Sequence, residues 1–323
     1  MGRSVDLAGV RGFREEHADY MKIAIPDLVS NSYFPVVAAV ELGCFQDEGL
    51  HATLDLVFPV DAAYRALADG QVDLVGGAAH AVLAAFPRWR GVKLLAAQSQ
   101  GMYWFLVMRP ELGIRRGDLS LLPGKRIAAA SWVDLGLKQL LAEAGVDPGA
   151  VDVVPVPVRR REATPNFGLL AAQALAEGLV DGFWANGMAA ELAVRAGAGT
   201  VILDARRGDG PPGGFDYTFA ALAATDRFIA ADKGRASAVV RALARSHALL
   251  VGDPALATKV GEHLFPSEPA SLIEDLVRRD SPFYSTAIPK RAIDGMANFA
   301  RARGLLDGTL VYDDVVAIDL LAG

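Results

Sequence analysis

Apolar residues recur along the chain in two spacings, one typical of strands and one typical of helices, with glycine-rich turns between them. The run KIAIP at 22–26 and the alternating stretch HATLDLVF at 51–58 predict strands. Apolar positions in 34–45 and 60–70 follow the helical period, and Gly70 suits the end of the second helix. Strands alternating with helices over short connections predict a mainly parallel sheet with helices on both faces.

The same alternation starts again after a long extended stretch, GMYWFLVMRPEL at 101–112. Further strands are expected, with helices between them, at 125–130, 151–158, 180–185 and 199–205. The segment RRGDGPPGGFD is rich in turn-forming residues, and the run at 217–225 after it is extended again. Everything beyond that run is predicted to be helical.

Two segments share an internal pattern, ALADGQVDLVGGAAHAV at 66–82 and ALAEGLVDGFWANGMAA at 174–190. Each predicts a helix that ends at glycine, a short strand, and small residues that open another helix. Structural equivalence of the two segments would give two similar α/β lobes; the alternative is that unrelated helix–turn–strand units happen to look alike. Leaving the first lobe near 107 and returning near 218 would make two crossings, which together form a hinge.

The expected division follows from these crossings. Residues 1–20 would be a loose N-terminal extension, residues 21–106 with 219–323 the first lobe, and residues 107–218 the second lobe. The C-terminal helices would pack on the first lobe. A chain of 323 residues is long enough for two such units.

Composition excludes several classes of function. The net charge of −6, without a basic stripe, argues against nucleic acid as a partner. The single cysteine, Cys44, can form neither an internal disulfide nor a CxxC metal site, and it is interpreted as a structural residue. The chain has no GxSxG, HExxH or P-loop motif, and no metal site and no cofactor are expected.

The N-terminal 20 residues are mixed and charged, without the continuous apolar segment of a secretory signal. The sequence as written therefore predicts a cytoplasmic protein, or a periplasmic or extracellular one if the N-terminus is processed or misassigned. No segment is apolar enough to span a bilayer, so direct membrane insertion is not expected. We expect a monomer.

Four segments in this order carry a resemblance: NSYFPVVAAVELGCFQDEGL, ALADGQVDLVGGAAHAVLA, LPGKRIAAA and ALAEGLVDGFWANG. Together they resemble solute-binding proteins of ABC importers, in the class that binds nitrate, sulfonates, taurine and thiamine precursors. The resemblance spans residues 21–265 and implies a two-lobed, type II periplasmic-binding-protein fold with two hinge crossings. It also implies a small-molecule ligand in the cleft between the lobes and an ABC permease as partner.

The same fold also occurs in cytoplasmic enzymes, among them pyrimidine synthases and an aryl-sulfinate desulfinase. The desulfinase resemblance would require a cysteine on the first strand-to-helix turn, which here reads SNSYF, and the synthases carry a cysteine-rich motif. An enzyme or ligand sensor acting on a small aromatic or heterocyclic compound is the alternative to a transport protein. Its candidate base would be His80, working with Asp134 or Asp216.

Ligands of open α/β sheets bind beyond the carboxyl ends of the strands, where SNSYF is expected to lie. Asn31 and Ser32 would offer hydrogen bonds, and Tyr33 and Phe34 a flat apolar wall. The alternative is that Ser30 or Ser32 caps the helix and that Phe34 belongs to the core.

The segment VGGAAH is expected at the same edge. Gly77 and Ala78 would let a ligand approach the backbone, and His80 would either contact the ligand or be a buried structural histidine. At the hinge, Gln100 and Tyr103 could reach the cleft. Because neighbouring strand residues point to opposite sides, only one of Tyr103 and Trp104 should face the ligand; the alternative is that both pack between the lobes.

The second lobe would supply the remaining candidates for ligand binding, which are Ser131, Trp132, Phe167, Trp184, Asn186 and Tyr217. Asn166 is expected to cap the helix that begins at Phe167. Aromatic, amide and hydroxyl groups with few charges indicate a small, planar or partly apolar organic solute. The run RRR at 159–161 would suit an anionic group on that solute, or it is a solvated surface loop.

Overall fold

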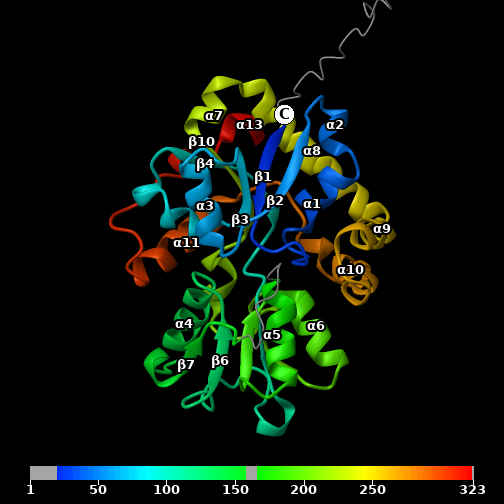
Figure 1. Ribbon diagram of the computed structural model, residues 1–323. Helices are drawn as coiled ribbons and strands as arrows, with labels where there is room; N and C mark the ends of the chain where they lie inside the picture. The colour runs from blue at the N-terminus through cyan, green and yellow to red at the C-terminus, as the bar shows by residue number, and fades with distance from the viewer. Residues whose placement is uncertain (1–19, 158–165, 322–323) are drawn as a thin grey trace, which may run out of the picture.

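Two five-stranded sheets, one in each lobe, form the framework of the protein (Figure 1). The computed structural model describes residues 20–157 and 166–321. The first sheet has the order β2-β1-β3-β10-β4, and its strands are β1 (Met21–Ile25), β2 (Ala52–Leu56), β3 (Leu74–Ala78), β4 (Val92–Ser99) and β10 (Ala220–Thr225). The second has the order β7-β6-β8-β5-β9, and its strands are β5 (Phe105–Met108), β6 (Arg126–Ala129), β7 (Asp152–Val154), β8 (Gly182–Ala185) and β9 (Thr200–Asp204). The two orders are equivalent, which confirms the prediction of a two-lobed α/β fold.

Each sheet contains one antiparallel strand that arrives directly from the other lobe. In the first sheet, β1 pairs in parallel with β2 and β3, and β10 lies antiparallel between β3 and β4. In the second sheet, β6 pairs in parallel with β7 and β8, and β5 lies antiparallel between β8 and β9. The carboxyl ends of the parallel strands in both sheets therefore face the junction between the lobes (Figure 1).

The repeated sequence pattern marks equivalent positions of the two lobes. The first copy forms the end of α3 (Val60–Ala68) and then β3, and the second forms the end of α5 (Phe167–Ala176) and then β8. Gly70 and Gly178 follow these helices with φ of 71° and 67°, a left-handed conformation that costs glycine little. The two strands occupy the same place in their sheets, so the structural equivalence is correct.

Helices cover both faces of each sheet. The first lobe has α1 (Phe34–Glu41), α2 (Cys44–Asp47) and α3, and the second has α4 (Asp134–Glu143), α5 and α6 (Gly187–Arg195). The chain after β10 is helical and packs on the first lobe, as expected (Figure 1). Its helices are α7 (Asp226–Ala231), α8 (Lys233–Gly252), α9 (Ala255–Leu264), α10 (Ser267–Asp280), α11 (Lys290–Ala302), α12 (Tyr312–Val315) and α13 (Ile318–Leu321).

Two segments join the lobes, residues 100–104 and residues 205–219. Strand β5 begins at Phe105, two residues before the boundary expected at 107. Gly101 turns the first segment with φ of 70°, and a Cβ at this position would overlap the ring of Phe215 in the second segment. The two segments therefore pass each other closely, and glycine is the residue that permits it.

The predicted local structure differs from the observed one at two places. The residues after β3 form a 3₁₀ helix, Ala79–Ala84, instead of an α-helix. Helix α1 begins after Tyr33 without a side-chain cap, so neither Ser30 nor Ser32 caps it. The expected cap at Asn166 is confirmed, because its side chain accepts a hydrogen bond from the Leu169 N–H at 3.4 Å.

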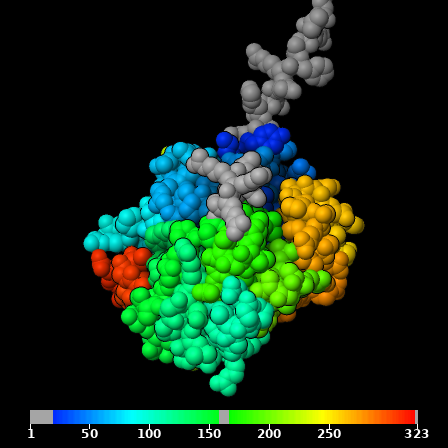
Figure 2. All heavy atoms as spheres, turned by 60° about the horizontal axis from the view of Figure 1, so that its bottom comes forward, coloured from blue at the N-terminus to red at the C-terminus, as the bar shows by residue number. Residues whose placement is uncertain are grey.

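The lobes touch over a wide area, as Figure 2 shows for the second lobe (green) and the helices around α10 (orange). Helix α6 of the second lobe packs on α10, and Arg195 forms an ion pair with Asp275 at 2.9 Å. In the part of the chain that is described, no helix combines the length and apolar character needed to cross a bilayer.

Candidate functional site

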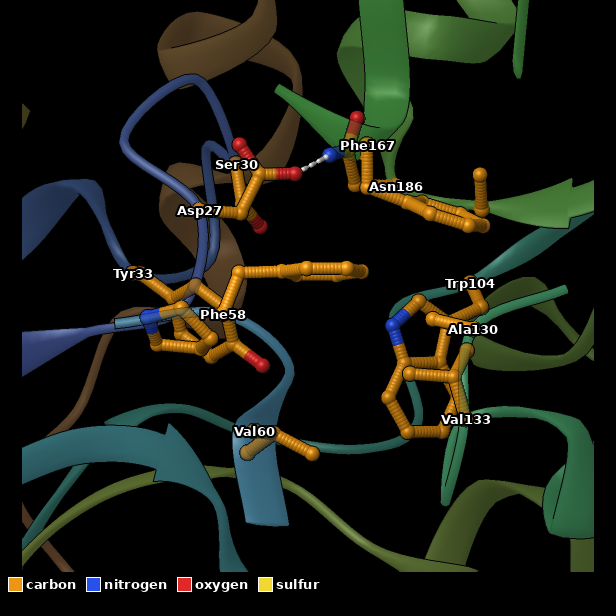
Figure 3. A pocket seen from close by; sticks show the side chains of 12 residues that line it. Asp27, Ser30, Tyr33, Phe58, Val60, Trp104, Ala130, Val133, Phe167 and Asn186 are labelled. Carbon is orange, nitrogen blue, oxygen red and sulfur yellow. Dashed lines mark hydrogen bonds between the residues drawn. The ribbon is translucent and has the colours of Figure 1, made fainter. Parts of the chain in front are cut away.

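A small cavity lies between the lobes, at the edge where the carboxyl ends of the strands meet (Figure 3). Its volume of about 30 Å³ is roughly two to three times the space that one water molecule needs. Residues from both lobes and from the first crossing segment line it, namely Pro26, Asp27, Ser30, Tyr33, Phe58, Val60, Trp104, Ala130, Val133, Phe167, Ala185 and Asn186.

The loop between β1 and α1 brings the first lobe's polar groups to the cavity. Strand β1 ends at Ile25, so Asp27 and Ser30 lie just beyond its carboxyl end, and Tyr33 directly precedes α1. Phe58 and Val60 reach the cavity from the end of the neighbouring strand β2. The parallel pairing of β1 and β2 explains why these two segments meet at one edge.

Asp27 is the acidic group of the cavity. One carboxylate oxygen accepts a hydrogen bond from the Val29 N–H at 3.1 Å, and the other accepts one from Asn186 Nδ2 at 2.5 Å (Figure 3). Burial raises the pKa of this carboxyl to about 7, outweighing the hydrogen bonds that lower it. Among the described residues, those that line the cavity include no Lys, Arg or His.

Asn186 reaches Asp27 from the second lobe while it caps a helix. Its side-chain oxygen accepts a hydrogen bond from the Ala189 N–H at 3.0 Å, at the N-terminus of α6, and its amide nitrogen donates to Asp27. Gly168 leaves room for this amide, because a Cβ there would lie 2.8 Å from Asn186 Nδ2. The hydrogen bond between Asn186 and Asp27 therefore joins the two lobes at the cavity.

Aromatic rings form the remaining walls. Phe58 of the first lobe stacks on Phe167 of the second, with ring centroids 5.8 Å apart and planes inclined by 22°. Trp104 of the crossing segment lies on the opposite side of the cavity, near Ala130 and Val133 (Figure 3). Such walls suit a flat or apolar body held between the lobes.

Tyr103 and Trp104 have separate roles. Trp104 lines the cavity, whereas Tyr103 points to Tyr33, with their hydroxyl oxygens 2.5 Å apart and their rings in an edge-to-face arrangement. Only one residue of the pair contributes to the wall, as strand alternation predicts, and it is Trp104 instead of the expected Tyr103.

His80 links the lobes outside the cavity wall. Its Nδ1 lies 2.9 Å from Thr218 Oγ1, and its Nε2 lies 3.1 Å from the carbonyl oxygen of Trp132. Burial lowers the pKa of His80 to about 4, so the imidazole is neutral at physiological pH. Trp132 has φ of 68°, an uncommon left-handed conformation, at the point where its carbonyl meets His80. This arrangement matches the structural interpretation of His80.

Several other sequence candidates lie in the protein interior and do not line the cavity. Phe34 packs against Phe265, with centroids 6.0 Å apart, and Tyr217 stacks on Phe299 at 5.0 Å. Trp184 is fully buried and donates from Nε1 to the Val133 carbonyl at 3.0 Å, behind the cavity wall. Other buried candidates near these positions are Ser32, Gly77 and Ala78.

Three candidates are directed elsewhere. Asn31 donates from its amide to Asp280, and Gln100 donates from Nε2 to the Ala287 carbonyl at 2.6 Å. Ser131 is exposed. Of the fifteen residues predicted from the sequence, the structure brings three into the cavity wall, which are Tyr33, Phe167 and Asn186.

The sequence-based search missed Asp27, Ser30 as a cavity residue, and Phe58. All three lie at the carboxyl end of a predicted strand or directly after it, in the segments IPDLVS and LVFP. That position, and not residue type, is the signal that would have found them. The run at 159–161, considered for an anionic group, lies outside the described residues.

A buried ionic cluster lies behind Asn31. Asp280 at the end of α10 pairs with Arg207 at 2.5 Å and lies 3.5 Å from Arg206. Burial favours the neutral acid, but Arg206, Arg279 and Arg207 together lower the pKa of Asp280 to about 2. Arg206 and Arg207 belong to the second crossing segment, so this cluster anchors that segment to α10.

Nothing in the described residues suggests a resident metal. No group of three His, Cys, Asp or Glu side chains within the described ranges is arranged to hold one. Cys44 is buried in the core of the first lobe, as the structural interpretation expected.

Solved structures with the same fold include binding proteins and an enzyme. The alkanesulfonate-binding protein SsuA from Xanthomonas axonopodis pv. citri is 16% identical and has a TM-score of 0.67, with 93% of this chain and 97% of that chain covered. The periplasmic nitrate-binding protein NrtA from Synechocystis PCC 6803 is 13% identical with a TM-score of 0.70, covering 94% and 88%. The desulfurization enzyme DSZB is 15% identical with a TM-score of 0.63, covering 93% and 97%. At these identities the likeness shows the shared two-lobed fold.

Sequence comparison adds the family. A search of curated proteins finds no match. The sequence profile described as NMT1/THI5 like matches residues 30–257, which include β2 to β10 and most of the cavity wall. The profile covers well over half of the chain, and the protein therefore belongs to the NMT1/THI5-like family.

Proposed function

We propose that this protein binds a small organic solute in the cavity between its lobes and serves as the solute-binding component of an ABC-type importer. The observation that carries the proposal is a cavity with walls from both lobes and from the crossing segment. A solute held there would touch both lobes at once. Solute binding would therefore favour the closed arrangement over an open one.

The residues proposed to contact the solute are those that line the cavity with polar or aromatic groups. They are Asp27, Ser30, Tyr33, Phe58, Trp104, Phe167 and Asn186. The other residues predicted from the sequence would act indirectly, because they support the wall or join the lobes. Trp184 supports Val133 from behind, and His80 joins the first lobe to Trp132.

The relatives of known structure support an importer role. SsuA is described as an alkanesulfonate-binding protein and NrtA as a periplasmic nitrate-binding protein. We propose an ABC permease as the partner of this chain, which would act as a monomer outside the cytoplasm and present the outer faces of both closed lobes to the permease.

DSZB shows that this fold also supports an enzyme, so catalysis is the competing function. In this chain both ring nitrogens of His80, the candidate base, already lie within hydrogen-bond distance of a partner: Nδ1 of Thr218 Oγ1, and Nε2 of the Trp132 carbonyl oxygen. Its candidate partner Asp134 accepts a hydrogen bond from Lys138 Nζ at 2.5 Å. Neither residue lines the cavity, and we therefore propose binding without chemistry.

Native mass spectrometry of the purified protein, followed by release and identification of any retained molecule, tests the proposal. We expect a small solute bound at one per chain and recovered unchanged after prolonged incubation. Conversion of that solute by the protein would contradict the binding role. The absence of any retained or saturably bound small solute would contradict the proposed function altogether.

Substitution of the aromatic wall tests the location of the site. Phe58→Ala removes one ring of the stacked pair with Phe167, and the affinity for the retained solute should fall about tenfold or more. Phe228→Ala provides the control, because Phe228 is a buried ring on α7 that does not line the cavity. Isothermal titration calorimetry of both variants measures the effect. Equal affinities of the two variants would place the site elsewhere.

A further inference from the structure

Hydrogen-bond acceptors without a matching donor gather at one end of the cavity. Asp27 accepts hydrogen bonds from the Val29 N–H and Asn186 Nδ2, and the Gly168 N–H contributes a weaker third one, although an ionised carboxylate offers about four acceptor positions in all. The Ser30 hydroxyl is fully buried beside it and has no hydrogen-bond partner among the described residues. Both side chains face the cavity (Figure 3). A bound molecule with N–H donors would complete these hydrogen bonds.

The charge of Asp27 is also uncompensated. The guanidinium groups of Arg279 on α10 and Arg207 on the second crossing segment pair with a different acid, Asp280. Asn186 and the backbone N–H groups near Asp27 are neutral donors. A buried carboxylate without a cation is costly, so a positively charged group brought by a ligand would remove much of that cost.

The walls next to Asp27 suit the same kind of ligand. Phe58 and Phe167 present their stacked rings, and Tyr33 and Trp104 present further aromatic surface. Aromatic faces attract a cation placed over them, and they also accept a flat apolar body. An anion would find neither attraction from the ring faces nor a cationic side chain among the described lining residues.

From these contacts we infer that the solute carries a positively charged nitrogen group, an amidinium or a protonated amine, which binds Asp27 and Ser30. The inference rests on the proposed function and specifies the ligand class of the same cavity. It sets this chain apart from SsuA and NrtA, whose named ligands are a sulfonate and nitrate.

Two series of matched probes test the charge of the ligand. Acetamidinium, acetamide and acetate have nearly the same shape and differ in charge, as do benzamidinium, benzamide and benzoate. Titration calorimetry at pH 8.5 should show each amidinium binding at least tenfold more tightly than its neutral amide, and the carboxylate more weakly still. Tighter binding of the carboxylate in either series would overturn the inference.

Two isosteric variants assign the effect to one carboxyl group. Asp27→Asn should reduce amidinium affinity at least tenfold and leave amide affinity within about twofold. Asp216→Asn is the matched control, because Asp216 is a half-buried carboxyl on the second crossing segment that does not line the cavity. It should leave both affinities unchanged. An unchanged amidinium affinity in Asp27→Asn would overturn the inference.

The pH dependence of the unmodified protein provides a measurement that needs no variant. A proton competes with the amidinium for Asp27, so affinity should be constant above pH 7 and fall up to tenfold per pH unit below it. Of the titratable groups nearby, burial raises the pKa of Tyr33 beyond this range, His80 stays neutral down to about pH 4, and Asp280 is ionised throughout. Affinity that does not change between pH 8.5 and 5.5 would contradict the role of Asp27.

The charge of any retained solute decides the case in which none of the six probes binds. A retained cation, identified after release from the purified protein, supports the inference, and a retained anion overturns it while leaving the proposed function intact. If no small molecule is retained and none binds, the proposed function itself fails, and the inference fails with it.

Discussion

At the scale of single residues, Asp27 combines burial with a pKa raised from 3.8 to about 7. Between these two values the folded protein holds a proton that the unfolded chain releases. The contribution of Asp27 to stability therefore declines as pH rises through this window and is constant above about 7. The full difference corresponds to about 4 kcal/mol at most, because each unit of pKa is worth about 1.4 kcal/mol.

Asp27→Asn should remove this dependence. The variant should gain stability over the unmodified protein as pH is raised from 5 to 8.5, by up to about 3 kcal/mol, because only the interval from pH 5 to the pKa of about 7 contributes. His80 and His247, whose pKa values burial lowers to about 4, are common to both proteins and cancel in the comparison. Urea unfolding at the two pH values measures the difference. A stability difference that is the same at pH 5 and pH 8.5 would show that Asp27 titrates normally.

The residue types of the site were easier to predict than the residues themselves. Aromatic, amide and hydroxyl groups do line the cavity, but Phe34 lies in the core and Trp104 replaces Tyr103 in the wall. An aromatic residue at the start of a buried helix suits a ligand wall and a core equally well. Only the tertiary packing, here the contact of Phe34 with Phe265 about 230 positions away, separates the two.

At the scale of elements, the end of α10 holds the ionic cluster that anchors the second crossing segment to the first lobe. Asp280 is almost fully buried and accepts hydrogen bonds from Asn31, Arg207 and Arg279. The loop after β1, the second crossing segment and α10 therefore share one carboxylate. Loss of that carboxylate would leave buried guanidinium groups without a counter-charge.

Asp280→Asn should destabilise the protein by about 3–5 kcal/mol, as expected when one partner of a buried ion pair is removed. Asp275→Asn, earlier on the same helix, breaks the exposed pair with Arg195 and should cost about 1 kcal/mol or less. Thermal and urea unfolding of both variants compare them directly. Similar losses of unfolding free energy in the two variants would mean that the buried ionic cluster stabilises the protein no more than the exposed ion pair does.

The order of elements was largely predictable, and their ends were not. The repeated ALADG and ALAEG segments do mark equivalent helix–strand units, because glycine after a helix and an apolar run have local causes. The short 3₁₀ helix after β3 is held by contacts with residues distant in the sequence. His80, for example, lies on that 3₁₀ helix and is held by Thr218 and Trp132.

At the scale of the whole molecule, the contact between Asp27 and Asn186 favours the closed arrangement of the lobes. A hydrogen bond to a charged group is worth about 1.5–3 kcal/mol. Its loss should lower the ratio of closed to open molecules by about tenfold or more. Asn186 also caps α6, so a useful variant must keep this cap but carry a side chain too short to contact Asp27.

Asn186→Ser meets this requirement, because serine also caps helices but is too short to reach Asp27. Small-angle X-ray scattering should show a larger radius of gyration for this variant. Asn166→Ser makes the same change at the cap of α5, where the asparagine side chain bonds to its own helix among the described residues, and should leave the radius unchanged. If neither variant expands, closure does not depend on this contact.

The place of β10 in the first sheet has a consequence for the order in which the chain folds during synthesis. All five strands of the second sheet come from one uninterrupted stretch, residues 105–204, whereas the first sheet needs residues 220–225 between β3 and β4. The ribosome therefore delivers every strand of the later lobe before the earlier lobe receives its fifth strand, β10. Until then β3 and β4 each expose an unpaired edge, so the half that is made first is the half that is finished last.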